Sequence, residues 1–272
     1  MAESDKKDVA WYQAEIGGIP APVRKLFETY SGIAPDRVEP HILEVRDRAW
    51  KVWPYPCIGL FRFLDLGISE SQSYPEIIDR LKHGECLLDL GCCFGQEIRK
   101  LVADGAPSEN TYGADLHGEF IEAGYDLFQD KGKLKTKFLT ADILDPSSAF
   151  TQLDGKLDMI WVGSFLHLFG WDDQVNVATR LVQLLRTRKG SVVFGRQAGN
   201  ITPGEIPHSA NAGGTMYRHD PASFEKLWQE VGKVTGTKWN VKARLEEIKE
   251  GPKGGAWNDP NARLLLFAVH RE

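Results

Sequence analysis

Residues 87–95 read Leu87-Leu88-Asp89-Leu90-Gly91-Cys92-Cys93-Phe94-Gly95, and the helical pattern Gln96–Ala103 follows directly. An apolar run that ends in an acid, a glycine-containing turn and a helix is typical of a nucleotide-binding strand-turn-helix unit. Gly91 can adopt a positive φ at little steric cost, and Gly95 allows the backbone to approach a ligand closely. The stretch therefore predicts a nucleotide-binding α/β domain.

The glycine spacing in this turn separates two classes of nucleotide-binding protein. A dinucleotide fingerprint requires glycines at positions 91, 93 and 96, but this chain has Cys93 and Gln96 at the last two of these positions. The difference argues against an oxidoreductase that uses a nicotinamide cofactor. A buried strand followed by a purely structural glycine turn is the alternative.

Polar or small residues follow three further predicted strands. The strand at 111–114 leads into Asp115 and Leu116, the strand at 137–141 into Asp142 and Ile143, and the strand at 157–162 into Gly163. Ligands of open α/β sheets bind beyond the carboxyl ends of the strands, and an acid after the second strand is where such folds bind ribose hydroxyls. Any one of these acids taken alone is more often a cap or loop residue than a ligand, but their occurrence in order predicts a cofactor site along one sheet edge.

From residue 85 onward the chain alternates between strand and helix patterns, which is typical of a parallel sheet covered on both faces. A helix is expected at 119–128. Asp172 or Asp173 is expected to cap the next helix, and Pro221 to begin a helix that Gly232 ends. With late strands at 191–195, 238–245 and 263–270, the pattern predicts a seven-stranded α/β sheet.

Residues 1–84 differ from the rest because aromatic residues are scattered among prolines. Helical spacing over 40–52, ended by Pro54, and a second helix at 75–81 indicate short helices and turns. We expect an N-terminal helical cap that supplies aromatic walls to a small-molecule pocket, followed by a main domain at 85–272. A simple packing layer over the sheet is the alternative.

A long segment at 197–219 follows the fifth predicted strand and is rich in glycine, alanine and asparagine. Structureless loops of this length are usually functional lids or disordered segments. Because the segment leaves the carboxyl end of that strand, we expect a substrate-binding lid inserted in the main domain.

Composition narrows the class of partner. The formal net charge of −5 and an isoelectric point near 5.9 argue against binding of nucleic acid, which normally requires a basic surface. No stretch approaches about 18 consecutive apolar residues, and the polar start at 1–7 is not that of a signal peptide. We therefore expect no membrane span, a cytoplasmic protein and a small-molecule substrate.

The four cysteines, Cys57, Cys86, Cys92 and Cys93, have no CxxC spacing and lie in or beside apolar runs. They are expected to be reduced core or turn residues. No cysteine or histidine pair has the usual spacing of metal ligands, so no metal is expected.

Three stretches, 87–101, 104–116 and 165–174, together resemble class I S-adenosylmethionine-dependent methyltransferases. Within that class they are most similar to fungal enzymes that methylate carboxyl groups in meroterpenoid pathways built on dimethylorsellinic acid. The departure is Cys93, where the class usually has a glycine. The resemblance implies a Rossmann-like seven-stranded sheet, S-adenosyl-L-methionine as cofactor and a small-molecule carboxylic acid as substrate. The sequence does not determine the oligomeric state, and a homodimer is one option. The cofactor contacts that the resemblance implies are Asp89, Gly91, Cys93, Gly95, Asp115, Leu116, Asp142, Ile143 and Gly163.

Methyl transfer is an in-line displacement, so the protein must mainly align an oxygen nucleophile with the methyl carbon and exclude water. A carboxylate, ionised above a pKa of about 4, needs no general base, whereas a phenol with a pKa of about 10 profits from one. His167 is the candidate base or orienting donor, Arg196 the candidate carboxylate ligand, and His208 a third candidate. The alternative for His167 is a capping or core histidine. For Arg196 it is an ion pair with a structural acid, and for His208 it is an exposed loop position. A phenol O-methyltransferase and a noncatalytic S-adenosylmethionine-binding protein remain the alternative functions.

Overall fold

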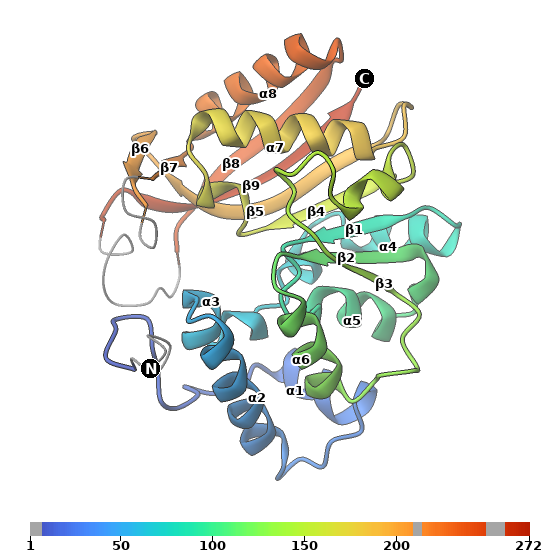
Figure 1. Cartoon of the computed structure of the whole chain (residues 1–272), viewed down its shortest axis with the longest axis vertical. Helices are drawn as coiled ribbons and strands as arrows, with labels where there is room; N and C mark the ends of the chain where they lie inside the picture. The colour runs from blue at the N-terminus through green and yellow to red at the C-terminus, as the bar shows by residue number, and fades with distance from the viewer. Residues whose placement is uncertain (1–6, 209–213, 249–258) are drawn as a thin grey trace.

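The computed structural model describes residues 7–208, 214–248 and 259–272. A seven-stranded sheet runs through its centre in the order β3-β2-β1-β4-β5-β9-β8 (Figure 1). The first five strands in this order, β3, β2, β1, β4 and β5, are parallel to one another. Strand β9 pairs antiparallel with both β5 and β8. The predicted seven-stranded sheet is confirmed. Its strands are β1 Leu87–Leu90, β2 Thr111–Asp115, β3 Lys137–Thr140, β4 Met159–Gly163, β5 Val192–Asn200, β8 Trp239–Glu246 and β9 Ala262–Arg271.

Helices cover both faces of the sheet because successive strand residues point to opposite sides. Leu88 and Val193 pack with residues of α7 and α8, whereas Leu87 packs with Ile77 of α4 and Leu101 of α5. Within the described residues, no helix has the length and apolar composition needed to cross a membrane. The helices of this part are α4 Tyr74–Lys82, α5 Gln96–Ala103, α6 Gly118–Phe128, α7 Trp171–Leu184 and α8 Pro221–Thr235, with short 3-10 turns η5 Ser108–Asn110, η6 Ala149–Leu153 and η7 Leu166–Leu168.

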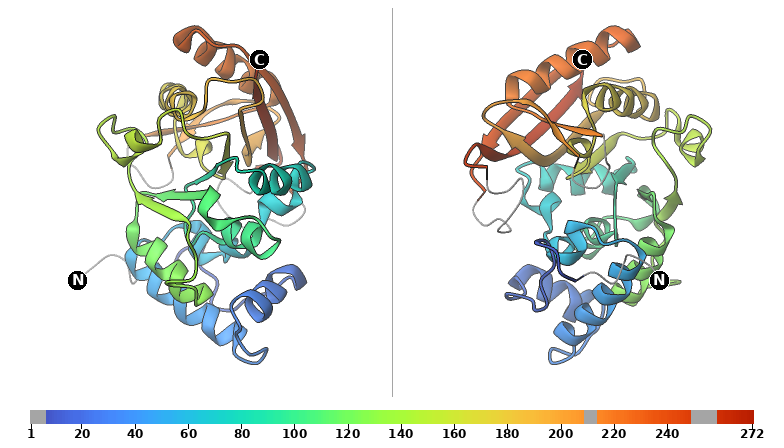
Figure 2. Two further views of the ribbon diagram at one scale, coloured as in Figure 1. Left: turned by 90° about the vertical axis from the view of Figure 1, so that its right-hand side faces the viewer. Right: turned by 60° about the vertical axis from the view of Figure 1, so that its left-hand side comes forward.

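The N-terminal segment packs outside α6 and forms the lower layer in Figures 1 and 2. Phe27 and Trp50 share one core with Phe94 of the turn after β1 and with Phe120 and Phe128 of α6. The rings of Phe27 and Phe128 stack with centroids 5.2 Å apart. The segment is therefore joined directly to the turn after β1. Its elements are α1 Ala21–Lys25, the π-helix η2 Leu26–Tyr30, α2 Val38–Val52, α3 Pro56–Gly59, and the 3-10 turns η3 Arg62–Leu64 and η4 Gly67–Glu70.

The segment at 197–219 is not the structureless loop that its composition predicts, and its role as a substrate lid stays a prediction. Residues 197–200 continue β5, because β9 supplies hydrogen-bonding partners along this whole length. Strands β6 (Gly204–Pro207) and β7 (Thr215–Arg218) then pair as an antiparallel hairpin. Residues 209–213 lie outside the described part of the chain. The predicted lid is thus largely ordered strand structure.

Two predicted helix boundaries are also wrong. The N-cap of α7 is Gly170, and Asp172 and Asp173 lie in the first turn, where acids favour the positive end of the helix dipole. Helix α8 passes through Gly232 and ends at Gly236, which has φ +65°. A Cβ at Gly232 would lie 2.7 Å from the Thr237 carbonyl oxygen, so this glycine makes room for the returning chain.

Candidate functional site

The turn between β1 and α5 has the backbone conformation expected of a nucleotide-binding turn. Gly91 has φ +71°, and a Cβ there would lie 2.6 Å from the Phe165 ring. Gly95 has φ +64°, and a Cβ there would lie 2.7 Å from Arg99 Nη1. Both positions require glycine for conformation and for space. Cys93 also has a positive φ, 51°, so the turn keeps a left-handed residue without a middle glycine.

Asp115, at the end of β2, holds this turn in place. Its Oδ2 accepts a hydrogen bond from the Cys93 N–H at 2.9 Å, and its Oδ1 accepts one from the His117 N–H at 3.0 Å. Burial raises the pKa of the Asp115 carboxyl, and the backbone N–H groups oppose that rise. Each carboxylate oxygen can accept a further hydrogen bond, so the group can still bind a ribose diol.

Asp89, in β1, has a buried carboxyl group with an unpaired atom. The residue is 3% exposed, and its Oδ2 has no hydrogen-bond partner among the described residues. Burial, and then the neighbouring Glu97 and Asp115, raise the pKa of Asp89 well above its usual value. Unpaired buried polar atoms are rare, and three acids beside one turn favour a positively charged ligand. S-Adenosylmethionine has positive sulfonium and ammonium groups, so the residues present fit this cofactor.

Exposed apolar and aromatic side chains lie beside Asp115. Leu116 is 56% exposed and Trp53 is 45% exposed. The His117 ring stacks on Trp53 with centroids 5.6 Å apart and meets Tyr55 edge-on at 5.8 Å. The N-terminal segment thus brings two aromatic residues to the end of β2, where a planar base can stack on an apolar surface.

The remaining predicted cofactor residues lie after β3 and at the end of β4. Asp142 is exposed, and its Oδ1 accepts a hydrogen bond from the Leu144 N–H at 2.9 Å. Ile143 is 5% exposed and packs in the sheet core. At Gly163 a Cβ would lie 2.7 Å from Trp161 Nε1. Because β3, β2, β1 and β4 are adjacent and parallel, all of the predicted cofactor residues lie along one sheet edge.

His167, in η7 after β4, has cationic surroundings. Arg218 Nη1 donates a hydrogen bond to the His167 carbonyl oxygen at 2.6 Å. The ring Nδ1 is buried and has no hydrogen-bond partner in the described part of the chain. Burial, and then the charges of Arg218 and Arg62, lower the pKa of His167 well below its usual value. The imidazole is therefore neutral near neutral pH and can donate one hydrogen bond.

Arg196 and His208, the other two residues predicted to contact the methyl acceptor, have surroundings different from those of His167. Arg196 Nη1 forms an ion pair with Glu70 Oε2 at 2.6 Å, and its side chain packs against Gly67. This is the pairing with a structural acid that the sequence leaves open. The His208 N–H donates to the Gly214 carbonyl oxygen at 2.9 Å, next to residues that the structure does not describe. The arginine that donates a hydrogen bond to His167 is thus Arg218 and not Arg196.

Two charged residues, Glu97 near Asp89 and Arg218 near His167, are not predicted from the sequence. Glu97, in the first turn of α5, accepts hydrogen bonds from the N–H groups of Gly67 and Ile68 at 2.8 and 3.1 Å. Its position near a helix N-terminus is a signal that could identify it. Arg218 lies in the segment predicted as a lid, and its proximity to His167 depends on the β6–β7 hairpin. No local sequence pattern reports that contact.

Two protein-family models match the chain. The meroterpenoid methyltransferase N-terminal domain matches residues 11–64, and a methyltransferase domain matches residues 87–188. The O-methyltransferase atr3 of Stereocaulon alpinum is 46% identical over 272 residues, which cover 99% of this chain and 78% of that protein. The asnovolin E/chermesin D methyltransferase nvfJ of Aspergillus novofumigatus is 42% identical, over 92% of this chain and 89% of that protein.

Solved structures share the fold at low sequence identity. The mitomycin 7-O-methyltransferase MmcR superposes with a TM-score of 0.52 at 14% identity, over 92% of this chain and 66% of that chain. The 1,6-didemethyltoxoflavin-N1-methyltransferase of Burkholderia thailandensis, solved with S-adenosylhomocysteine, gives a TM-score of 0.52 at 12% identity, over 85% and 90% of the two chains. At these identities the likeness extends to the fold alone.

Proposed function

The chain belongs to the fungal meroterpenoid methyltransferases, and from this premise we propose that it methylates a carboxyl group of a small aromatic or terpenoid-conjugated acid. It is an S-adenosylmethionine-dependent O-methyltransferase. The carboxylate as acceptor is the proposed part. A homodimer and a cytoplasmic location remain predictions, of which light scattering tests the first and localisation of the tagged protein the second.

We assign the cofactor to the edge formed by β3, β2, β1 and β4. Asp89 and the turn Gly91–Cys93–Gly95 face the charged methionine portion, and Asp115 binds the ribose hydroxyls. The adenine then lies near Leu116, Asp142 and Ile143, and Gly163 borders the methyl-transfer position. The unpaired Asp89 Oδ2 and the exposed Leu116 support this placement. When bound, S-adenosylmethionine supplies a methyl group on a positively charged sulfur.

The choice of a carboxylate acceptor depends on the environment of His167. General base catalysis is most effective when the pKa of the base lies near the working pH, but burial and two arginines lower the pKa of this histidine. It is therefore poorly suited to deprotonate a phenol with a pKa of about 10. As a neutral donor it can orient an acceptor that is already ionised. A carboxylate meets that condition.

The proposed reaction requires no proton transfer. A carboxylate oxygen of the acceptor forms a bond to the methyl carbon while the carbon–sulfur bond breaks and its electron pair stays on sulfur. The products are a methyl ester and S-adenosylhomocysteine. The task of the protein is to align the two reactants and to exclude water.

A panel of aromatic acids that includes 2,4-dihydroxybenzoic acid tests the proposal, because that compound offers a carboxyl and two phenol groups. Mild alkali removes a methyl ester but not an aryl ether, so mass spectrometry before and after alkali identifies the acceptor. We expect an ester, and a kcat that changes little between pH 8 and pH 6. His167→Gln is expected to lower kcat by less than about 10-fold, against about 10²–10⁴-fold for a general base.

A phenol mechanism predicts the contrary result. The product would be an ether stable to alkali, and the rate would rise with pH as the phenol ionises. Failure to methylate any acid of the panel would also contradict the proposed acceptor.

A further inference from the structure

Arg218, the last residue of β7, is a largely buried arginine without an acidic partner. Its guanidinium donates to the His167 carbonyl oxygen at 2.6 Å and makes a weak contact with Met216 Sδ at 3.9 Å. Among the described residues, no carboxylate forms an ion pair with it. Burial alone lowers the pKa of Arg218 to about 10, a shift that a neighbouring carboxylate would oppose.

Arg46 and Arg99, which are buried more fully than Arg218, have acidic partners. Arg99 is 0% exposed and forms a two-pronged pair with Asp130, with both bonds at 2.9 Å. Arg46 is 1% exposed and bonds Asp47 at 2.7 Å. A buried charge is costly unless it is paired. Arg218 is thus an exception to the pattern in the described chain, and an anionic ligand would supply the missing charge.

Arg218 also forms part of the wall of a cavity of about 270 Å³. This volume is near the lower end of small-ligand pockets, about 300 Å³. The wall is apolar at Ala198, Ile206, Pro207 and Ala262, and carries the charged residues Asp259 and Arg263. The Asp259 carboxylate accepts a hydrogen bond from Asn200, and Arg263 donates to the backbone carbonyls of Pro260 and Ala262.

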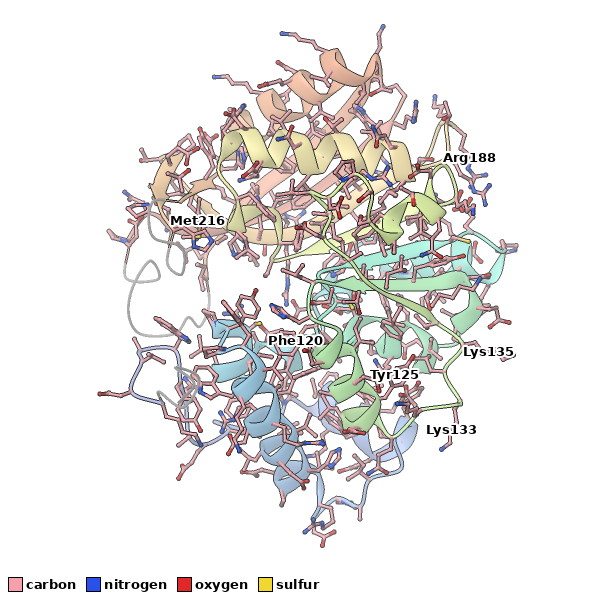
Figure 3. All side chains as sticks on the ribbon, in the orientation of Figure 1. Phe120, Tyr125, Lys133, Lys135, Arg188 and Met216 are labelled. Atoms are coloured by element: carbon pink, nitrogen blue, oxygen red, sulfur yellow. The ribbon has the colours of Figure 1, made fainter. Side chains whose placement is uncertain are left out.

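Strand β5 connects the cavity to the proposed methyl-transfer position, although no assigned cofactor residue lines the cavity. Ala198 follows Arg196 by two residues in β5, and Arg196 pairs with Gly163 at the end of β4. The bond from Arg218 to the His167 carbonyl joins the hairpin to the residues that follow β4. Met216, which is labelled in Figure 3, marks the position of β7 at one side of the sheet domain. A largely apolar pocket in which neither Arg218 nor Arg263 forms an ion pair within the described residues fits an aromatic acid better than a neutral molecule.

We propose that Arg218, which lines this cavity and donates to the His167 carbonyl oxygen, is the residue that recognises the carboxylate of the acceptor. The inference rests on the proposed carboxyl methylation. One carboxylate oxygen binds the guanidinium, and the other remains free for methylation. Because the product ester has no charge, it loses the ion pair, so Arg218 distinguishes substrate from product.

Binding measurements separate this role from catalysis. Isothermal titration of the S-adenosylhomocysteine complex with an acid that the wild-type enzyme methylates, and with its methyl ester, gives both dissociation constants without turnover. In Arg218→Gln we expect the Kd of the acid to rise by about 10- to 100-fold, the range for a charge-assisted hydrogen bond, with the Kd of the ester unchanged. Arg218→Lys retains the charge and is expected to restore part of the acid affinity.

Arg244→Gln is the matched control, because it removes a positive charge that pairs with Glu246 on the exposed edge strand β8. It is expected to leave both constants unchanged. Unchanged binding of S-adenosylhomocysteine and of the ester shows that Arg218→Gln is folded. Equal acid affinity in wild type and Arg218→Gln would overturn the inference, even if the wild-type product is an ester. An ether product would instead overturn the proposed function.

Discussion

At the scale of single residues, Asp115 combines two tasks in one carboxylate. It fixes the turn through the Cys93 and His117 N–H groups, and we assign the ribose hydroxyls to its remaining lone pairs. Asp115→Ala should therefore weaken S-adenosylhomocysteine binding by about 10- to 100-fold, since hydrogen bonds to charged groups contribute about 1.5–3 kcal/mol. Isothermal titration measures this change. An affinity equal to that of wild type would remove Asp115 from the cofactor site.

The control for this variant is Asp145→Ala. Asp145 is an exposed acid whose carboxylate, like that of Asp115, accepts hydrogen bonds from nearby groups, in its case the N–H and hydroxyl of Ser147. It lies after β3 and has no assigned contact with the cofactor. Its replacement should leave the Kd of S-adenosylhomocysteine unchanged.

The raised pKa of Glu97 makes the free energy of unfolding depend on pH. Burial raises the pKa of this carboxyl to about 7, against opposition from Arg196 and the N–H groups of Ile68 and Gly67. Between about pH 4.5 and pH 7 the native state retains a proton that the unfolded state has lost, so this group lowers stability as pH rises, by up to about 1.4 kcal/mol per pH unit. Above pH 7 the penalty is constant.

Glu97→Gln removes this titration. Its free energy of unfolding should therefore improve relative to wild type as pH rises from 5 to 7, and the difference should then stay level to pH 8. Urea unfolding at four pH values measures it. A difference that is the same at every pH would mean that Glu97 does not titrate in this range.

At the scale of elements, the Arg99–Asp130 pair joins α5, the residues after α6 and the N-terminal segment. Arg99 also donates to the Phe94 carbonyl oxygen at 2.7 Å, and the Tyr30 hydroxyl donates to Asp130 at 2.7 Å. Asp130→Ala leaves a buried guanidinium uncompensated, which costs about 3–5 kcal/mol. We expect a correspondingly lower free energy of unfolding by urea denaturation.

Asp126→Ala provides the comparison, because Asp126 forms an ion pair with Arg48 at 2.9 Å in which both side chains are more than half exposed. Such surface pairs contribute about 0–1 kcal/mol. Similar losses of stability in the two variants would contradict the structural role of the buried pair.

The strands and helices of the sheet were predictable because their signals are local. Apolar runs with glycine turns locate β1 and α5, and alternation locates β8, in which every second residue is exposed. The acids at the strand ends were predictable for the same reason. Their common edge follows from the parallel order of the strands and not from any single residue.

The errors concern features that depend on distant partners. Residues 197–200 are strand because β9, more than 60 residues later, pairs with them. The helix-ending glycine is Gly236 and not Gly232, because Gly232 makes space for the Thr237 carbonyl. The unpaired Arg218 beside His167 likewise depends on the hairpin, so the sequence proposed Arg196 in its place.

At the scale of the whole molecule, the N-terminal segment and the sheet domain share a core. Phe94 and Phe120 belong to the turn and to α6, yet they pack in the same cluster as Val38, Ile42 and Trp50. Figure 2 shows the N-terminal helices against α6. Removal of the segment would expose these aromatic side chains to water, so the two parts are expected to unfold as one cooperative unit.

Hydrogen exchange tests that cooperativity through the cofactor site. A ligand that binds only the native state stabilises it by RT ln(1 + [L]/Kd), which is about 2.7 kcal/mol, or about 100-fold in exchange rate, at a ligand concentration of about 100 times Kd. Amides of α2 and β4 that exchange only through global unfolding should therefore slow by the same factor when S-adenosylhomocysteine is added. Mass spectrometry of peptides from Val38–Val52 and Met159–Gly163 measures both. If β4 slowed and α2 did not, the N-terminal segment would open independently, and its aromatic residues Trp53 and Tyr55 would not be held at the cofactor edge by the fold.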